Sequence, residues 1–225
     1  MRNPLHDRVL MNITSAIFDC SAPDLESCPE ETLPEFAFIG RSNVGKSSLL
    51  NALAGRNGLA KVSKTPGHTK LINFFTMNNS WRLVDLPGYG FAQVARENKE
   101  KFNQAVNDYL VNRENLSGVF VLIDSRHPPQ KIDLEFVHWL GTSSVPLVLV
   151  FTKTDKSKPA RVQKNIELFK ESMSGWFDEL PEIFTCSSVT KNGLTELLGV
   201  IDESLVGEPE PEPDSPVPWG KPVAV

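Results

Sequence analysis

The sequence predicts an α/β fold with an open, mostly parallel β-sheet and helices on both faces. Segments with strand-like and helix-like patterns alternate along the chain at spacings that suit such a sheet. The run Val145 to Phe151 is continuously apolar, as expected for a parallel strand buried on both faces. A glycine-rich turn separates the apolar run Phe36 to Ile39 from a helical pattern, and this order of strand, turn and helix is typical of the α/β class.

The individual elements follow from apolar runs, turn residues and helical periodicity. Asn78, Asn79 and Ser80 form a short polar link between two strands, so these two strands are expected to pair antiparallel. Gly193 is expected to open the last helix. Strands are expected near residues 13–18, 36–39, 71–77, 81–86, 118–123, 146–151 and 182–186, and helices near 46–54, 97–113, 131–140, 160–173 and 193–205.

Length and composition favour one main domain in a soluble protein. The chain has 225 residues, of which 40% are apolar, and can bury one sizeable core. No apolar run approaches the ~20 residues of a membrane-spanning helix, and the N-terminus lacks the apolar core of a signal peptide. A cytoplasmic protein without a membrane partner is therefore expected. The three cysteines form no C-x-x-C pair, which argues against a zinc site.

Charge and proline content divide the chain into three parts. Residues 1–35 are interpreted as an N-terminal extension with one added strand and an acidic linker, because residues 19–35 contain six acidic side chains and no basic one. Residues 36–206 form the main domain, which is mildly basic although the whole chain has a net charge of −5. Residues 207–225 are interpreted as an acidic, proline-rich tail that is expected to be disordered. The small basic excess permits contact with RNA, but an ordinary solvated surface also explains it.

The turn from Gly40 to Ser47 reads G-R-S-N-V-G-K-S and fits the phosphate-binding template G-x-x-x-x-G-K-[ST]. Glycines allow backbone N–H groups to face a polyphosphate, and the start of the following helix adds partial positive charge. In this template Lys46 reaches the β and γ phosphates, and the Ser47 hydroxyl binds Mg²⁺. A nucleoside triphosphate is therefore the expected ligand.

Two further motifs follow expected strands and specify that ligand. The D-x-x-G motif runs from Asp85 to Gly88; its carboxylate holds Mg²⁺ through water, and its glycine N–H meets the γ phosphate. The T-K-x-D motif runs from Thr152 to Asp155, directly after a buried apolar run. The Asp155 carboxylate can accept hydrogen bonds from guanine N1–H and from the N2 amino group, which adenine does not offer. The expected nucleotides are GTP and GDP, with Mg²⁺.

Longer strings resemble the EngB family of bacterial ribosome-biogenesis GTPases, in the TRAFAC class. These strings are G-R-S-N-V-G-K-S-S-L-L-N-A-L, S-K-T-P-G-H-T-K, V-D-L-P-G-Y-G-F-A, D-S-R-H-P and T-K-T-D-K, and the resemblance spans about residues 9–205. It implies a Ras-like P-loop GTPase fold, with residues 36–206 as the GTP-binding domain. It also implies a role in assembly of the large (50S) ribosomal subunit, through the particle or its rRNA, and a requirement in cell division and septation. A monomer is expected.

Further site residues come from this resemblance by position. Thr69 resembles the switch I threonine, which completes the Mg²⁺ shell with its hydroxyl and senses the γ phosphate with its backbone. Ser187 and Ser188 resemble the loop whose backbone N–H meets guanine O6. The expected catalytic residues are Asn43, Lys46, Thr69 and Gly88, and the expected Mg²⁺ ligands are Ser47 and Thr69. The expected nucleotide-binding residues are Gly40, Arg41, Ser42, Asn43, Val44, Gly45, Lys46, Ser47, Gly67, His68, Thr69, Lys70, Leu71, Asp85, Leu86, Pro87, Gly88, Thr152, Lys153, Thr154, Asp155, Cys186, Ser187 and Ser188.

Three positions bear on hydrolysis. Tyr89 follows D-x-x-G where Ras-like proteins have the glutamine that orients the attacking water, so unaided hydrolysis is expected to be far below ~1 s⁻¹. Asn43 is similar to an asparagine that helps to hold K⁺ between the α and γ phosphates in K⁺-activated relatives, while stabilisation of the turn is an equal alternative. His127, in D-S-R-H-P, is interpreted as a loop-packing residue rather than a base.

Three functions remain open at this level. The first is a GTPase whose GTP-ordered form binds a pre-ribosomal particle and is released by hydrolysis. The second is a nucleotide-gated binding module in which hydrolysis is incidental. The third is a GTPase that acts on another RNA.

Overall fold

Seven strands form one mixed sheet in the computed structural model, which describes residues 11–60, 71–89 and 96–206, with the backbone alone for residues 96–103. The strands are β1 (Ala16–Ala22), β2 (Glu35–Gly40), β3 (Ile72–Met77), β4 (Trp81–Asp85), β5 (Leu116–Asp124), β6 (Leu147–Thr152) and β7 (Ile183–Thr185). Their spatial order is β1-β3-β4-β2-β5-β6-β7. β3 pairs antiparallel with β1 and β4, and the remaining pairs are parallel. The prediction of a mostly parallel sheet with one antiparallel strand is confirmed.

The link between β3 and β4 has the tight geometry that its residues favour. Asn78 and Asn79 have φ of 50° and 56°, a left-handed conformation that asparagine tolerates better than most residues. The Asn78 side chain also accepts the N–H groups of Thr14 and Ser15, at 2.8 and 3.2 Å. Because residues before Ala16 are bound to this turn, the strand expected near residues 13–18 lies further along the chain, where it pairs with β3.

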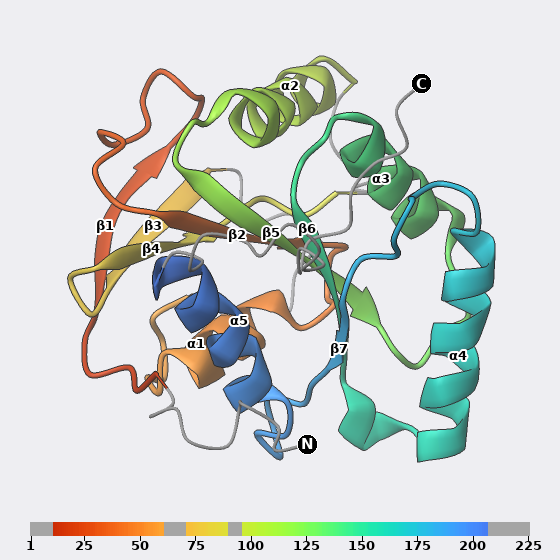
Figure 1. Ribbon diagram of the computed structural model, residues 1–225. Helices are drawn as coiled ribbons and strands as arrows, with labels where there is room; N and C mark the ends of the chain where they lie inside the picture. Colours follow the sequence, from red (N-terminus) through yellow and green to blue (C-terminus); the bar gives the residue numbers. More distant parts are fainter. Residues whose placement is uncertain (1–10, 61–70, 90–95, 207–225) are drawn as a thin grey trace, which may run out of the picture.

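In the described residues, five helices cover the two faces of the sheet (Figure 1). α1 (Lys46–Leu53) and α5 (Leu194–Val206) pack on one face, and α2 (Arg96–Asn112), α3 (Lys131–Thr142) and α4 (Pro159–Ser172) on the other. Alternate residues of β2 enter the two cores, with Phe36 and Phe38 on the α1 side and Ala37 and Ile39 on the opposite side. Each expected helix is confirmed, with bounds that differ by at most two residues.

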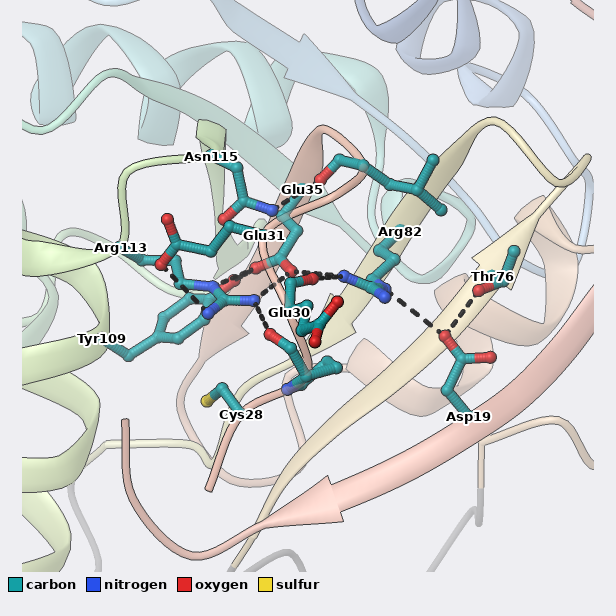
Figure 2. Close-up of polar contacts among 12 residues, drawn as sticks. Asp19, Cys28, Glu30, Glu31, Glu35, Thr76, Arg82, Tyr109, Arg113 and Asn115 are labelled. Carbon is teal, nitrogen blue, oxygen red and sulfur yellow. Dashed lines mark hydrogen bonds and ion pairs between the residues drawn. The ribbon is translucent and has the colours of Figure 1, made fainter. Parts of the chain in front are cut away.

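A buried polar cluster ties the N-terminal segment to the body at the end of the sheet where β2 begins (Figure 2). Glu35 is fully buried and accepts Arg113 at 2.7 and 2.9 Å and the Tyr109 hydroxyl at 2.8 Å. Arg82, on β4, contacts Glu35 at 3.3 Å and donates to the Glu30 carbonyl at 2.7 Å. Part of the segment expected to be an acidic linker therefore packs against α2 and β4, because its carboxylates and carbonyls pair with arginines of the domain.

The parallel strands bring the sequence motifs together at the other edge of the sheet. β2 ends at Gly40, β4 at Asp85, β5 at Asp124 and β6 at Thr152. Open α/β sheets bind their ligands at the carboxyl ends of the strands, so this edge is the place for a site. None of the helices in the described ranges combines the length and apolar character that a membrane span requires.

Candidate nucleotide-binding site

The loop between β2 and α1 has the backbone of a phosphate-binding turn. Asn43 and Gly45 have φ of 61° and 107°, both in the left-handed region. A Cβ on Gly40 would lie 2.8 Å from the Leu122 carbonyl oxygen, so the loop starts directly against β5. Glycine at 40 and 45 is therefore explained by close approach and by backbone conformation. The N-terminus of α1 follows at once, which directs its N–H groups toward the loop.

Lys46, the first residue of α1, forms an ion pair with Asp85 at the end of β4. Both side chains are buried, with exposed fractions of 9% and 5%. The pair joins the lysine expected at the phosphates to the carboxylate expected near Mg²⁺. Because a buried charge is stable only beside an opposite charge, Lys46 and Asp85 can separate only if each gains a new partner of opposite charge. A phosphate for Lys46 and a cation for Asp85 satisfy that need together.

The D-x-x-G segment lies in backbone contact with the phosphate loop. A Cβ on Gly88 would lie 2.6 Å from the Gly40 carbonyl oxygen. Leu86 and Pro87 are buried, and the Leu86 N–H donates to the Phe38 carbonyl at 3.1 Å. Only glycine fits at position 88 without moving one of the two motifs.

Asp133, in the first turn of α3, joins these two motifs through side chains. Its carboxylate is 1% exposed and accepts Arg41 Nε at 2.9 and 3.0 Å and the Tyr89 hydroxyl at 2.9 Å. The Tyr89 ring stacks on Phe136 with centroids 4.3 Å apart. Burial raises the pKa of Asp133 and outweighs the opposite effects of Arg41 and Tyr89. Burial and the nearby Asp133 raise the pKa of Tyr89 well above its ordinary value, so its hydroxyl is a neutral donor.

Sequence reasoning missed Asp133. An acidic residue in the first turn of a helix is ordinarily explained by the helix dipole, and nothing in its neighbourhood points to Arg41, which is 92 residues away. The one usable signal was the tyrosine at position 89, because it departs from the Ras-like pattern at the place where this contact forms.

The T-K-x-D segment from Thr152 to Asp155, here called the base loop, is fastened to the phosphate loop by two side chains. The Thr152 hydroxyl contacts the Val44 carbonyl at 2.7 Å. Lys153 Nζ donates to the Asn43 carbonyl and, at 2.8 Å, to the Asp124 carboxylate. Threonine at position 152 thus binds the phosphate loop through its side chain.

Asp155 lies in a short 3₁₀ helix, Thr154–Lys156, and is held in its ionised form. The Ser187 hydroxyl donates to it at 2.7 Å, and Lys156 Nζ lies 3.2 Å from its second oxygen. The hydrogen bond from Ser187 lowers the pKa of Asp155, and Lys156 acts in the same direction. An ionised carboxylate only accepts hydrogen bonds, which is what the N1–H and N2 groups of guanine require.

The segment from Cys186 to Ser188 lies beside this loop. The Cys186 carbonyl accepts the N–H and the hydroxyl of Thr154 at 3.3 and 3.1 Å. Gly193 then allows α5 to begin, because it has φ of 79° and a Cβ there would lie 1.9 Å from the Thr185 carbonyl oxygen. Ser187 and the residues after it are therefore held close to Asp155 by the backbone.

Asp124, the last residue of β5, is a second carboxylate whose role sequence reasoning missed. Its side chain is 7% exposed and accepts Arg126 at 2.7 and 2.9 Å as well as Lys153. Burial alone would raise the pKa of Asp124, but the hydrogen bonds from Arg126 and Lys153 outweigh it and hold the pKa well below its usual range. His127 is exposed, and its backbone N–H donates to the backbone carbonyl of Asp124 at 3.3 Å.

Four residues of the predicted site, Gly67, His68, Thr69 and Lys70, lie outside the described residues. Leu71, directly before β3, is 40% exposed. Ser47 is partly exposed in the first turn of α1. The other predicted residues lie in the phosphate loop, the D-x-x-G segment and the two base segments, which meet at the carboxyl edge of the sheet.

Comparison of the sequence with known families gives a clear match. Residues 35–153 match a family model described as "50S ribosome-binding GTPase". A relative from Porphyromonas gingivalis, named probable GTP-binding protein EngB, is 51% identical over 192 residues, which cover 85% of this chain and 96% of that protein.

Solved structures share the fold. The crystal structure of a probable GTP-binding protein EngB matches with a TM-score of 0.61 and 25% identity, over 77% of this chain and 100% of that one. A structure of Era in complex with MgGDPNP and nucleotides 1506–1542 of 16S ribosomal RNA matches with a TM-score of 0.60 and 25% identity, over 82% of this chain and 59% of that one.

Proposed function

Because the chain belongs to the EngB family of GTP-binding proteins, we propose that it hydrolyses GTP slowly and acts as a switch in assembly of the large ribosomal subunit. Membership places it among the Ras-like P-loop GTPases, which bind GTP. The observation that carries the GTP-binding part of this proposal is that Asp155 stands at the same edge of the sheet as the phosphate loop and follows Lys153, which binds that loop.

Guanine selection is assigned to Asp155. Its ionised carboxylate can accept from both N1–H and the N2 amino group, and an adenine base would leave it without these donors. A site built around a specific hydrogen-bonding group rejects an analogue that lacks the matching group by a large factor. Lys46 and the N–H groups of the phosphate loop bind the phosphates in this proposal.

Mg²⁺ fits the residues of the site. The Ser47 hydroxyl, and the Asp85 carboxylate through water, offer the oxygen atoms that this cation prefers, and Thr69 is proposed as the second direct ligand by resemblance. The bound ion supplies neutralising charge at the β and γ phosphates. The buried Lys46–Asp85 pair supports this assignment. A phosphate would replace Asp85 as the negative partner of Lys46, and a cation would replace Lys46 as the positive partner of Asp85.

Slow unaided hydrolysis is proposed from the position of Tyr89. Its hydroxyl is bound to Asp133 and its ring to Phe136, both on α3, so this side chain is engaged away from an attacking water. A ribosomal partner is proposed to stimulate the reaction. Asn43 is proposed to help bind a K⁺ ion that supplies positive charge between the α and γ phosphates. Equal single-turnover rates in KCl and NaCl with the 50S subunit present would show that Asn43 does not have this role.

The role in assembly of the large ribosomal subunit rests on the description of the matching family model, which names 50S ribosome binding. Sedimentation with 30S and 50S subunits in GDP, GTP and a non-hydrolysable analogue tests it. We expect nucleotide-dependent association with 50S alone. If the protein associates with the 50S subunit in none of these nucleotide states, the proposed ribosomal partner is wrong, while the proposed GTP site is unaffected. The requirement in cell division and septation, the cytoplasmic location and the monomeric state belong to the same proposal.

A nucleotide-gated binding module is the second candidate, and the Tyr89–Asp133 contact favours it because that contact leaves the reaction without a water-orienting residue at this position. A variant that binds GTP without hydrolysing it separates the two candidates. If that variant cycles normally off the 50S particle, hydrolysis is incidental and the switch proposal is wrong.

A further inference from the structure

The D-S-R-H-P sequence, which begins with the last residue of β5, contains a buried carboxylate that the proposed reaction does not use. Asp124 lies between two cations, with Lys153 Nζ at 2.8 Å and Arg126 Nη2 at 2.7 Å from the same oxygen, Oδ2. Its other oxygen accepts Arg126 Nε and the Arg126 N–H, at 2.9 and 3.1 Å. One carboxylate therefore fixes two cationic side chains at the carboxyl end of β5.

Lys153 connects Asp124 to the phosphate loop. Its Nζ also donates to the Asn43 carbonyl, and its stem passes Gly45, where a Cβ would lie 3.5 Å from Lys153 Cε. The lysine side chain is long and flexible, so its acceptors decide where it lies. The Asn43 carbonyl and Asp124 are the two acceptors of Lys153 Nζ within the described ranges of the chain.

We propose that Asp124 is a positioning residue for guanine-nucleotide binding, which holds Lys153 across the phosphate loop and so fixes the base loop relative to that loop. The inference rests on the proposed nucleotide site. Asp155 follows Lys153 by two residues, so a displaced Lys153 shifts the carboxylate that selects the base. The contact lies on loops that bind the base and the phosphates common to both nucleotides, so GDP and GTP must be affected alike.

The direct test is Asp124→Asn in the full chain, which keeps the shape and removes the charge. A hydrogen bond to a buried charged group corresponds to an affinity change of about ten- to a hundred-fold. We expect the dissociation rates of fluorescently labelled GDP and GTP to rise by that factor in parallel, with little change in their ratio. Stopped-flow displacement by unlabelled nucleotide measures both rates.

Two further variants make the result specific. Glu35→Gln is the matched control, because Glu35 is also a buried carboxylate bound by arginines (Figure 2). Glu35 is the first residue of β2 and lies at the edge of the sheet opposite to the phosphate loop. This variant should lower stability in thermal melting and leave the dissociation rates unchanged. Lys153→Met, alone and with Asp124→Asn, tests the route. If Asp124 acts through Lys153, the double variant dissociates no faster than Lys153→Met alone.

The outcomes separate the inference from the proposed function. Wild-type protein that fails to bind either labelled nucleotide overturns both. Wild-type binding with unchanged rates in Asp124→Asn, additive effects in the double variant, or an effect on GTP alone overturns only the positioning role. If Glu35→Gln accelerates nucleotide dissociation as much as Asp124→Asn does, general destabilisation explains the effect, and the positioning role is again wrong.

Discussion

At the scale of single residues, Asp155 is the proposed determinant of which base is bound. Asp155→Asn replaces one acceptor oxygen with a donor, so we expect GTP affinity to fall by about a hundred-fold or more. Xanthosine nucleotides, which carry a carbonyl at position 2 of the ring, should then bind more tightly than GTP. Competition against labelled GDP measures both. Ser187→Ala, which removes only one hydrogen bond to the carboxylate, should weaken GTP without recruiting xanthosine; unchanged GTP affinity in Asp155→Asn would contradict the assignment.

Tyr89 is the residue at which structure most changes the interpretation of sequence. Tyr89→Phe removes the hydroxyl bound to Asp133 and keeps the ring on Phe136. We expect the free energy of unfolding to fall by about 1–3 kcal/mol, because a buried hydrogen bond to a carboxylate is lost. Single-turnover hydrolysis should be unchanged, since the hydroxyl faces α3. Denaturant unfolding and single-turnover assays check this; a large rate loss at unchanged stability would show that the hydroxyl acts on the nucleotide instead.

At the scale of elements, the start of α5 depends on one glycine. Gly193→Ala puts a Cβ 1.9 Å from the Thr185 carbonyl oxygen at a φ of 79°, so we expect a loss of about 2–4 kcal/mol in stability. The loop that carries Ser187 should shift with it and weaken guanine binding. Gly199→Ala in the same helix meets no atom within 4 Å and should stabilise by about 0.5–1 kcal/mol. Similar melting temperatures for the two variants would contradict this account.

Elements were predictable where their signals are local. The Asn78-Asn79-Ser80 link identified the antiparallel pair, since asparagine favours the left-handed turn that joins such strands. The helix bounds were predictable as well, because the periodicity that marks a helix is also a local signal. Asp133 and Glu35 were not predictable in this way, because their partners are 44 to 92 residues away in sequence. A buried charge is explained only by the partner that tertiary structure supplies.

At the scale of the whole molecule, buried charges are concentrated at the two ends of the central strands. β2 begins at Glu35 in the arginine cluster and ends at Gly40, where the phosphate loop starts. Between them, Phe36 to Ile39 are at most 1% exposed. The apolar strand therefore separates two polar networks. The cluster at one end binds the N-terminal segment, and the networks at the other end position the loops that are proposed to bind the nucleotide.

This separation predicts that stability and nucleotide binding can be changed independently. Arg113→Met removes the main partner of Glu35 and leaves that carboxylate buried with only Arg82 and Tyr109, so we expect the free energy of unfolding to fall by about 3–5 kcal/mol. Nucleotide dissociation from the folded fraction should be unchanged. Glu31→Gln is the matched control: Glu31 pairs with the same arginine at 3.1 Å but is 33% exposed, so it should cost under about 1 kcal/mol. Urea unfolding distinguishes the two variants. Equal losses would mean that burial does not set the strength of this cluster, and faster nucleotide release in folded Arg113→Met would mean that the two ends of the sheet are coupled.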